Sequence, residues 1–209
     1  MMKHLAGIAV AAVAATFWLI SATEQSAQAQ AEWINAVRRG GYVIVFRHGA
    51  THQEQADTDP LNPKNVAQQR QLNEAGRAKA KEIGEAFRKL RIPVGQIQSS
   101  VFNRAVETGT LMGLGEVTST ADLAEGGLVV TPIENNRRAQ ALRKLAATVP
   151  PAGTNIVVVT HKPNILDAFG KDWFDVREGE ASIFRPENGK YVLVARVQMS
   201  DWPRIAAAR

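Results

Sequence analysis

Short apolar runs alternate with amphipathic stretches along most of this chain. Residues 42–46 form an uninterrupted apolar run, and residues 156–159 form another that ends at Thr160. Runs of this length predict strands that are buried on both faces of a sheet. Between them, apolar residues recur at helical spacing in a stretch that ends before Pro93, namely Leu72, Ile83, Phe87 and Leu90. This spacing predicts an amphipathic helix with one apolar face.

Weaker patterns continue the alternation of strands and helices. Residues 96–100 predict a short strand, and residues 104–108 predict the opening of a helix that follows it. A further helix is expected from about Arg137 to Val149, after the candidate caps Asn135 and Asn136. Its expected inward positions are Leu142, Leu145 and Val149.

The last third of the chain predicts a hairpin. Residues 181–185 and 191–197 are separated by a turn over 187–189, and Asn-Gly is a strong hairpin signal. Together these elements predict an α/β fold, a three-layer sandwich. Its central sheet is mostly parallel, helices cover both faces, and the late antiparallel hairpin lies at one edge.

The N-terminal residues have the pattern of a secretory signal peptide. A short positive region that includes His4 precedes residues 5–20, which carry no charge, and Ala27-Gln28-Ala29 follows. We expect cleavage after Ala29, which divides the chain into a signal peptide, residues 1–29, and one periplasmic or secreted domain, residues 30–209. The alternative is an uncleaved N-terminal membrane anchor. The apolar stretch has just the minimum length that can span a bilayer, so this alternative stays open.

Composition narrows the classes of function. The chain has 25 Lys and Arg against 20 Asp and Glu, and it has no cysteine. The absence of cysteine excludes both disulfides and thiolate phosphatase chemistry. Basic residues are scattered, without the interleaved aromatic side chains that stack on bases, so we expect no nucleic-acid partner. A mildly basic surface would attract anionic substrates or an anionic envelope surface.

The best functional clue is the tripeptide Arg47-His48-Gly49, which follows the first apolar run directly. In open α/β sheets, ligands bind at the carboxyl ends of the strands. Arg47 offers a forked donor for an oxyanion, and His48 offers an imidazole nucleophile. The other two strand ends add Arg104 and His161. These residue types at three strand ends predict phosphoryl transfer to histidine.

The chain resembles the histidine phosphatase superfamily, which has the phosphoglycerate mutase-like fold. The residues that carry the resemblance are 47–49, 69–80, 99–100, 104–108 and 159–161. The resemblance implies that His48 attacks phosphorus and forms a phosphohistidine, which water then hydrolyses, without a metal or cofactor. It also implies a phosphate cradle made of Arg47, Arg104 and His161 as an imidazolium. Thr51 lies just beyond the tripeptide and is a further expected substrate contact.

The leaving alkoxide needs a proton donor, which the sequence identifies less clearly. In relatives, this acid lies between the second arginine and the second histidine, or directly follows that histidine. Lys162 follows His161 here, which excludes the second position; Lys162 either adds charge to the cradle or points to solvent. We favour Glu134, ahead of the helix expected near Arg137. The alternatives are Asp122, Glu125, Glu54, Asp57 and Asp59.

We therefore expect an exported phosphomonoesterase that acts on a small phosphorylated substrate. By analogy with a small exported branch of the family, this substrate is an envelope phosphosugar. Contact with a membrane is expected only through the leader, if the leader is not cleaved. Two alternatives stay open: a catalytically weak phosphate-binding or scaffold protein of the same fold, and a phosphohistidine protein phosphatase.

Overall fold

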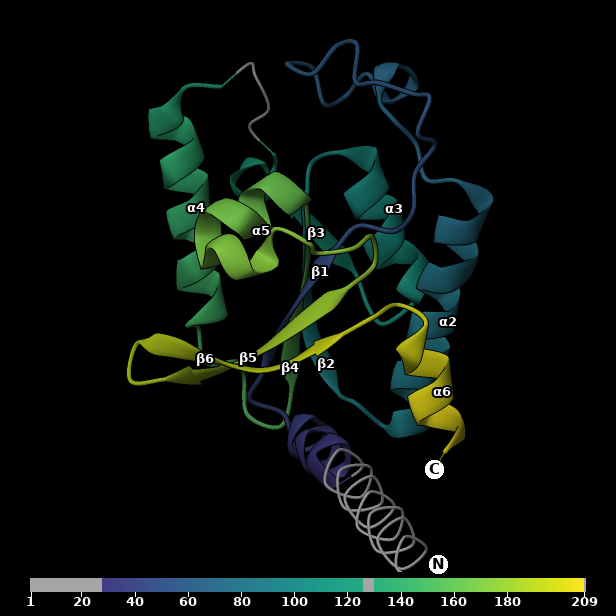
Figure 1. Cartoon of the computed structure of the whole chain (residues 1–209), viewed down its shortest axis with the longest axis vertical. Coiled ribbons are helices and arrows are strands. Elements are labelled where there is room, and N and C mark those ends of the chain that lie inside the picture. The colour runs from purple at the N-terminus through teal and green to yellow at the C-terminus, as the bar shows by residue number, and fades with distance from the viewer. Residues whose placement is uncertain (1–27, 126–129, 209) are drawn as a thin grey trace, which may run out of the picture. The chain divides into compact units, whose positions relative to one another are not determined.

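The computed structural model describes residues 28–125 and 130–208 (Figure 1). The chain divides into two compact units, residues 1–36 and 37–209. The predicted leader lies outside the described residues, except for its last two, which belong to a helix over residues 28–38. In these described ranges, no helix is both long and apolar enough to cross a membrane.

A six-stranded sheet forms the centre of the larger unit, in the order β3-β2-β4-β1-β5-β6. The first four strands in this order are parallel, whereas β5 pairs with β1 and β6 with β5 in antiparallel fashion. The predicted hairpin is therefore confirmed at the sheet edge. The strands are β1 (Val43–Arg47), β2 (Val94–Ser100), β3 (Val117–Thr120), β4 (Asn155–Thr160), β5 (Ala181–Glu187) and β6 (Lys190–Val197).

Helices cover both faces of the sheet, which confirms the predicted three-layer fold (Figure 1). On one face lie α2 (Glu74–Leu90), α3 (Asn103–Met112) and α6 (Asp201–Ala207). On the other face lie α4 (Pro132–Ala146) and α5 (Lys162–Phe169). Three short 3-10 helices complete the described elements: η1 (Val66–Gln68), η2 (Ala121–Leu123) and η4 (Lys171–Trp173).

The long helix α2 forms where its apolar stripe predicts, but it begins at Glu74, so Leu72 lies before it. The Asn73 side chain accepts a hydrogen bond from the Gly76 amide at 2.8 Å, which caps the first turn. Ile83 and Phe87 are buried, and the Phe87 ring lies 4.8 Å from the ring of Trp202 in α6. The packing of α2 and α6 thereby closes the core on this face of the sheet.

The start and end of α4 differ from the prediction. The helix begins at Pro132, where the Thr131 hydroxyl caps the Glu134 amide at 3.2 Å, and not at Arg137. Thr131 and Glu134 have the spacing of a capping box, and proline favours the first helical turn. The prediction that Val149 faces inward is wrong, because α4 ends at Ala146 and Val149 is 76% exposed.

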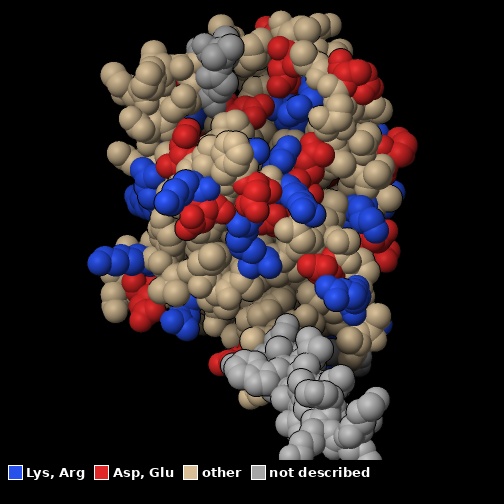
Figure 2. Space-filling model, viewed as in Figure 1, with Lys and Arg blue, Asp and Glu red and all other residues tan. Residues whose placement is uncertain are grey.

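Charged side chains of both signs are interleaved on the face that Figure 2 shows. The net charge of +5 is therefore not gathered into one large basic patch on that face. Interspersed charges of this kind favour solubility more than the binding of an extended polyanion.

Candidate active site

The sheet order brings three strand ends together. β4 lies between β2 and β1 and is parallel to both, so the residues that follow these three strands meet at the carboxyl ends of the strands. The His48 amide donates to the Thr160 carbonyl at 2.9 Å, and the imidazole rings of His48 and His161 lie 5.1 Å apart. Arg104, in the first turn of α3, lies with its guanidinium carbon 4.7 Å from the Phe102 ring, which also contacts His161.

His48 is held as a neutral imidazole with one free nitrogen. Its side chain is buried, and Nδ1 lies 2.9 Å from the Gly49 carbonyl oxygen, an acceptor only. Nδ1 must therefore carry the proton, which leaves the lone pair on Nε2. Burial first, and then the charge of Arg104, hold the pKa of His48 well below its usual value. An unprotonated Nε2 is the form that can attack phosphorus.

The loop after His48 is fixed by close backbone packing. The Gly49 amide donates to the Thr108 hydroxyl of α3 at 3.0 Å. Gly76, in the first turn of α2, approaches so closely that a Cβ there would lie 2.2 Å from the Ala50 carbonyl oxygen. This contact requires glycine at position 76, because any larger side chain would push the loop and helix apart.

His161 is buried directly before α5, and its two nitrogens have different surroundings. Nε2 lies 2.7 Å from the Ser100 hydroxyl, whereas buried Nδ1 has no hydrogen-bond partner and lies 3.8 Å from the Glu125 carboxylate. Burial, and then the charge of Arg104, hold the pKa of His161 well below its usual value. The imidazolium expected from the sequence is therefore disfavoured until a bound anion adds negative charge.

Carboxylates hold both predicted arginines. Arg104 is fully buried, and it donates through Nη1 to Asp57 at 2.9 Å and through Nη2 to Glu125. Arg47 lies with Nη2 3.4 Å from the carboxylate of Glu178. These pairs offset the cost of burying guanidinium groups beside two imidazoles.

Arg70 is a site residue that sequence reasoning missed. Its amide donates to Asp57 at 2.9 Å, and its charge contributes to the lowered pKa of both His48 and His161. Arg70 falls within the matching stretch 69–80, but nothing local separates it from other basic loop residues. We call His48, His161, Arg47, Arg70 and Arg104 together the site cluster.

Four nitrogen atoms of the site cluster are buried without a hydrogen-bond partner. They are Arg47 Nε, Arg70 Nε, Arg104 Nε and His161 Nδ1. A buried polar atom without a hydrogen bond costs about 1–3 kcal/mol, so four of them around one imidazole need a common explanation. An oxyanion with several acceptor oxygens fits all four. Within the described ranges, no group of three or more His, Cys, Asp or Glu side chains could hold a metal ion.

Glu134 has hydrogen-bond partners outside the site cluster. Its carboxylate accepts from Arg137 at 2.8 Å and from Arg138 at 2.9 Å. These hydrogen bonds lower the pKa of Glu134 to about 2. A carboxyl group that is ionised down to this pH is a poor proton donor for a leaving alkoxide.

Two of the alternative acids do reach the site cluster. Glu125 contacts Arg104 and lies beside His161, and Asp57 contacts Arg104. Glu54 instead pairs with His52 at 3.1 Å. The remaining alternatives also bind elsewhere: Asp122 to Arg137, and Asp59 to Asn65.

Two further predicted contacts have other partners. Thr51 is buried and donates to Glu178 at 2.9 Å. Lys162 lies with Nζ 4.9 Å from the centre of the Phe174 ring, a cation–π distance. Phe174 is itself 70% exposed, so this contact lies at the protein surface.

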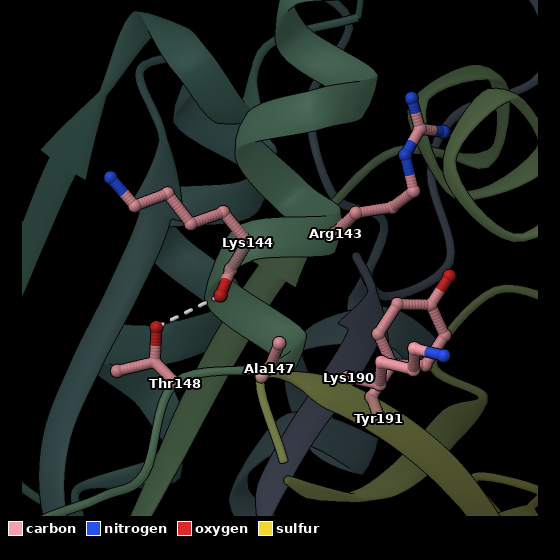
Figure 3. A pocket seen from close by; sticks show the side chains of 7 residues that line it. Arg143, Lys144, Ala147, Thr148, Lys190 and Tyr191 are labelled. Atoms are coloured by element: carbon pink, nitrogen blue, oxygen red, sulfur yellow. Dashed lines mark hydrogen bonds between the residues drawn. The ribbon is translucent and has the colours of Figure 1, made fainter. Parts of the chain in front are cut away.

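A surface hollow of about 770 Å³ lies away from the site cluster, between the end of α4 and the β5–β6 turn (Figure 3). It is lined by Arg143, Lys144, Ala147, Thr148, Gly189, Lys190 and Tyr191. Arg143 donates to the carbonyls of Asp167 and Ala168, so its guanidinium stabilises the end of α5. The lining includes neither a carboxylate nor a histidine, so the hollow lacks an imidazole nucleophile of the kind that His48 offers.

Comparison with known proteins supports the expected family. Residues 43–129, which include His48, Arg70, Arg104 and Glu125, match the model of the histidine phosphatase superfamily (branch 1). The resemblance seen in the sequence is thereby confirmed over this segment. No curated protein sequence matches the chain.

Solved structures share the fold at low sequence identity. The protein histidine phosphatase SixA, complexed with tungstate, matches with a TM-score of 0.53 and 16% identity, over 77% of this chain and 98% of its own. A phosphoserine phosphatase mutant from Entamoeba histolytica, in complex with phosphoserine, matches with a TM-score of 0.51 and 17% identity, over 76% of this chain and 97% of its own. A mycobacterial glucosyl-3-phosphoglycerate phosphatase matches with a TM-score of 0.52 and 17% identity, over 74% of this chain and 97% of its own.

Proposed function

We propose that this member of the histidine phosphatase superfamily is a phosphomonoesterase that transfers the phosphoryl group of its substrate to Nε2 of His48. One observation carries the proposal: a buried, neutral histidine with a free Nε2 lies among four unpartnered nitrogen atoms of cationic and imidazole groups. A nucleophile and an oxyanion site in one place are the two roles that phosphoryl transfer requires.

In the proposed reaction, the phosphoryl oxygens accept hydrogen bonds from Arg47, Arg70, Arg104 and His161. These donors balance the charge of the transferring group, which is the main contribution a protein makes to such a reaction. Nε2 of His48 forms a bond to phosphorus as the bond to the leaving oxygen breaks. Water then attacks the phosphohistidine, which releases inorganic phosphate and restores the imidazole.

We propose Glu125 as the acid of this reaction. In its protonated form, it gives a proton to the leaving oxygen, and the resulting carboxylate takes a proton from the attacking water in the second step. Its contact with Arg104 and its 3.8 Å distance from His161 support this role. Asp57 also contacts Arg104, but its other partner is the Arg70 amide, which suits a residue that holds the loop.

The substrate that we propose is a small phosphate ester outside the cytoplasm, such as an envelope phosphosugar. The predicted leader supports export. The solved structures with the same fold include a phosphoserine phosphatase and a glucosyl-3-phosphoglycerate phosphatase as well as a protein histidine phosphatase. A fold shared at this identity supports the class of reaction and leaves the substrate to experiment.

A phosphatase screen of the purified full chain tests the proposal. The panel comprises p-nitrophenyl phosphate, phosphosugars, nucleotides, phosphoserine and a phosphohistidine peptide, each with and without a chelator. We expect phosphate release from small esters that the chelator does not change. Release from the phosphohistidine peptide alone would support a protein phosphatase instead. Tight vanadate binding without any turnover would support a phosphate-binding protein.

A further inference from the structure

A segment far from the nucleophile in sequence holds the backbone of Arg47 and His48. The Gly179 amide donates to the His48 carbonyl at 2.9 Å and lies 3.1 Å from that of Arg47. The Arg47 amide donates in turn to the Glu180 carbonyl at 3.0 Å. Residues 176–180 therefore fix both residues of the motif from the side of the sheet where β5 begins.

The same segment holds the Arg47 side chain. Nη1 donates to the Val176 carbonyl at 2.9 Å, and Nη2 lies 3.4 Å from Oε1 of Glu178. That carboxylate oxygen also accepts from the buried Thr51 hydroxyl at 2.9 Å. The terminal nitrogens of the guanidinium thus face the protein, and Nε is the buried nitrogen without a partner.

The 176–180 segment is itself anchored from β6. The Glu180 carboxylate is buried, and it accepts from Arg196 at 2.5 Å, from Gln198 at 2.7 Å and from the Arg177 amide at 3.1 Å. A fully satisfied buried carboxylate rigidifies its surroundings. Glu178 is therefore presented to Arg47 by a fixed stretch of backbone.

We propose that Glu178 is a positioning residue, which with Thr51 holds the Arg47 guanidinium so that Nε faces the phosphoryl group. This inference rests on the proposed function, in which Arg47 binds that group. A free arginine side chain has several rotatable bonds, and each rotamer lost on binding weakens the affinity for a ligand. Glu178 removes this cost because the guanidinium is oriented before the ligand arrives.

The opposite role for Glu178 makes an opposite prediction. A carboxylate beside an anion site would, through its charge alone, repel the ligand and compete for the arginine. Removal of the charge would then tighten the binding of an oxyanion. Removal of a positioning residue weakens it, and glutamine, which keeps the accepting oxygen, largely restores it.

Orthovanadate, which resembles the transition state of phosphoryl transfer, is the probe. Its dissociation constant is measured for the purified full chain, for Glu178→Ala and for Glu178→Gln, together with kcat and KM on p-nitrophenyl phosphate. Glu187→Ala is the matched control, because Glu187 also pairs with an arginine on β5, 3.1 Å from Arg185, and is exposed. We expect Glu178→Ala to bind vanadate about tenfold more weakly and to have a raised KM. Both quantities should change by less than about threefold in Glu178→Gln and Glu187→Ala.

Unchanged or tighter vanadate binding by Glu178→Ala would overturn the inference. If that variant does not fold, Thr51→Val gives the decision: it removes one hydrogen bond to Glu178, and we expect it to weaken vanadate binding about threefold. An equal vanadate dissociation constant for Thr51→Val and the wild type would then count against the inference. A wild-type chain that hydrolyses no ester argues against the proposed reaction alone, because the vanadate affinities still decide the role of Glu178.

Discussion

Arg104 is the residue on which most contacts of the site cluster depend. Its guanidinium is fully buried, contacts Asp57 and Glu125, and is the largest charge effect on the pKa of both imidazoles. Its place in the first turn of α3 would oppose the helix dipole, but the two carboxylates compensate. One side chain thus links the nucleophile, the candidate acid and the second histidine.

Replacement of Arg104 by lysine tests this role at the scale of one residue. An ammonium group keeps the charge but cannot contact two carboxylates and a phosphoryl group in one plane. We expect kcat/KM for p-nitrophenyl phosphate to fall by about tenfold or more, with a lower midpoint of thermal unfolding. Lys144→Ala, in the hollow of Figure 3, is the control and should keep wild-type activity. Wild-type activity in Arg104→Lys would contradict the role.

Glu125 and Glu134 make a matched pair for the identity of the acid. Glu125→Gln should strongly reduce the hydrolysis of alkyl phosphates, whose leaving groups need a proton, but largely spare p-nitrophenyl phosphate. Glu134→Gln should leave both activities near the wild-type values, because its carboxylate is bound by Arg137 and Arg138. The ratio of the two activities is the measurement. Loss of alkyl activity in Glu134→Gln alone would return the role to that residue.

The sequence could predict the residues of the site that stand next to clear elements. His48 and His161 each follow an apolar strand, and Arg104 opens the helix that follows another strand. The carboxyl ends of parallel strands lie together, so these three residues could be predicted to meet. Arg70 and Glu178 could not be found in this way. Both lie in segments without a regular pattern, and only the folded backbone brings them to Arg47 and the imidazoles.

Among the elements, α4 explains why Glu134 has arginine partners. Thr131 and Glu134 start the helix as a capping box, and Glu134 then pairs with arginines one turn later. The two asparagines resembled caps but lie inside the first turns. Short elements such as β3 and α6 were not predicted, because β3 is half-exposed at the sheet edge and α6 has seven residues.

The contact between α2 and the loop after His48 gives a prediction for an element. Alanine is usually favoured over glycine in a helix by about 1 kcal/mol. Gly76→Ala should instead destabilise the protein and reduce its activity, because the new Cβ would lie 2.2 Å from the Ala50 carbonyl oxygen. Thermal unfolding and phosphate release measure the two effects. A raised unfolding midpoint with full activity would show that the loop does not depend on this contact.

At the scale of the whole molecule, the two buried histidines predict how stability depends on pH. Both have a lowered pKa in the folded state, so the unfolded chain binds more protons below the usual histidine pKa of about 6.5. The free energy of unfolding should therefore fall as the pH decreases below that value, by up to about 1.4 kcal/mol per pH unit for each histidine. The fall ends only when the folded-state pKa values are reached.

Urea unfolding between pH 5 and pH 6.5 measures this slope, in a range where most carboxylates stay ionised. His48→Asn removes one of the two groups, so we expect its slope to be roughly half that of the wild type. The same slope in both proteins would mean that His48 is not buried in its neutral form.

The most direct test of the account is to trap the phosphoenzyme. The full chain is mixed briefly with a labelled phosphate ester, quenched with alkali and mapped by peptide. We expect an acid-labile, base-stable phosphoryl group on His48, and no labelled protein from a folded His48→Ala variant, which should also release no phosphate. A phosphoryl group on any other residue, or near-normal turnover by folded His48→Ala, would contradict the mechanism.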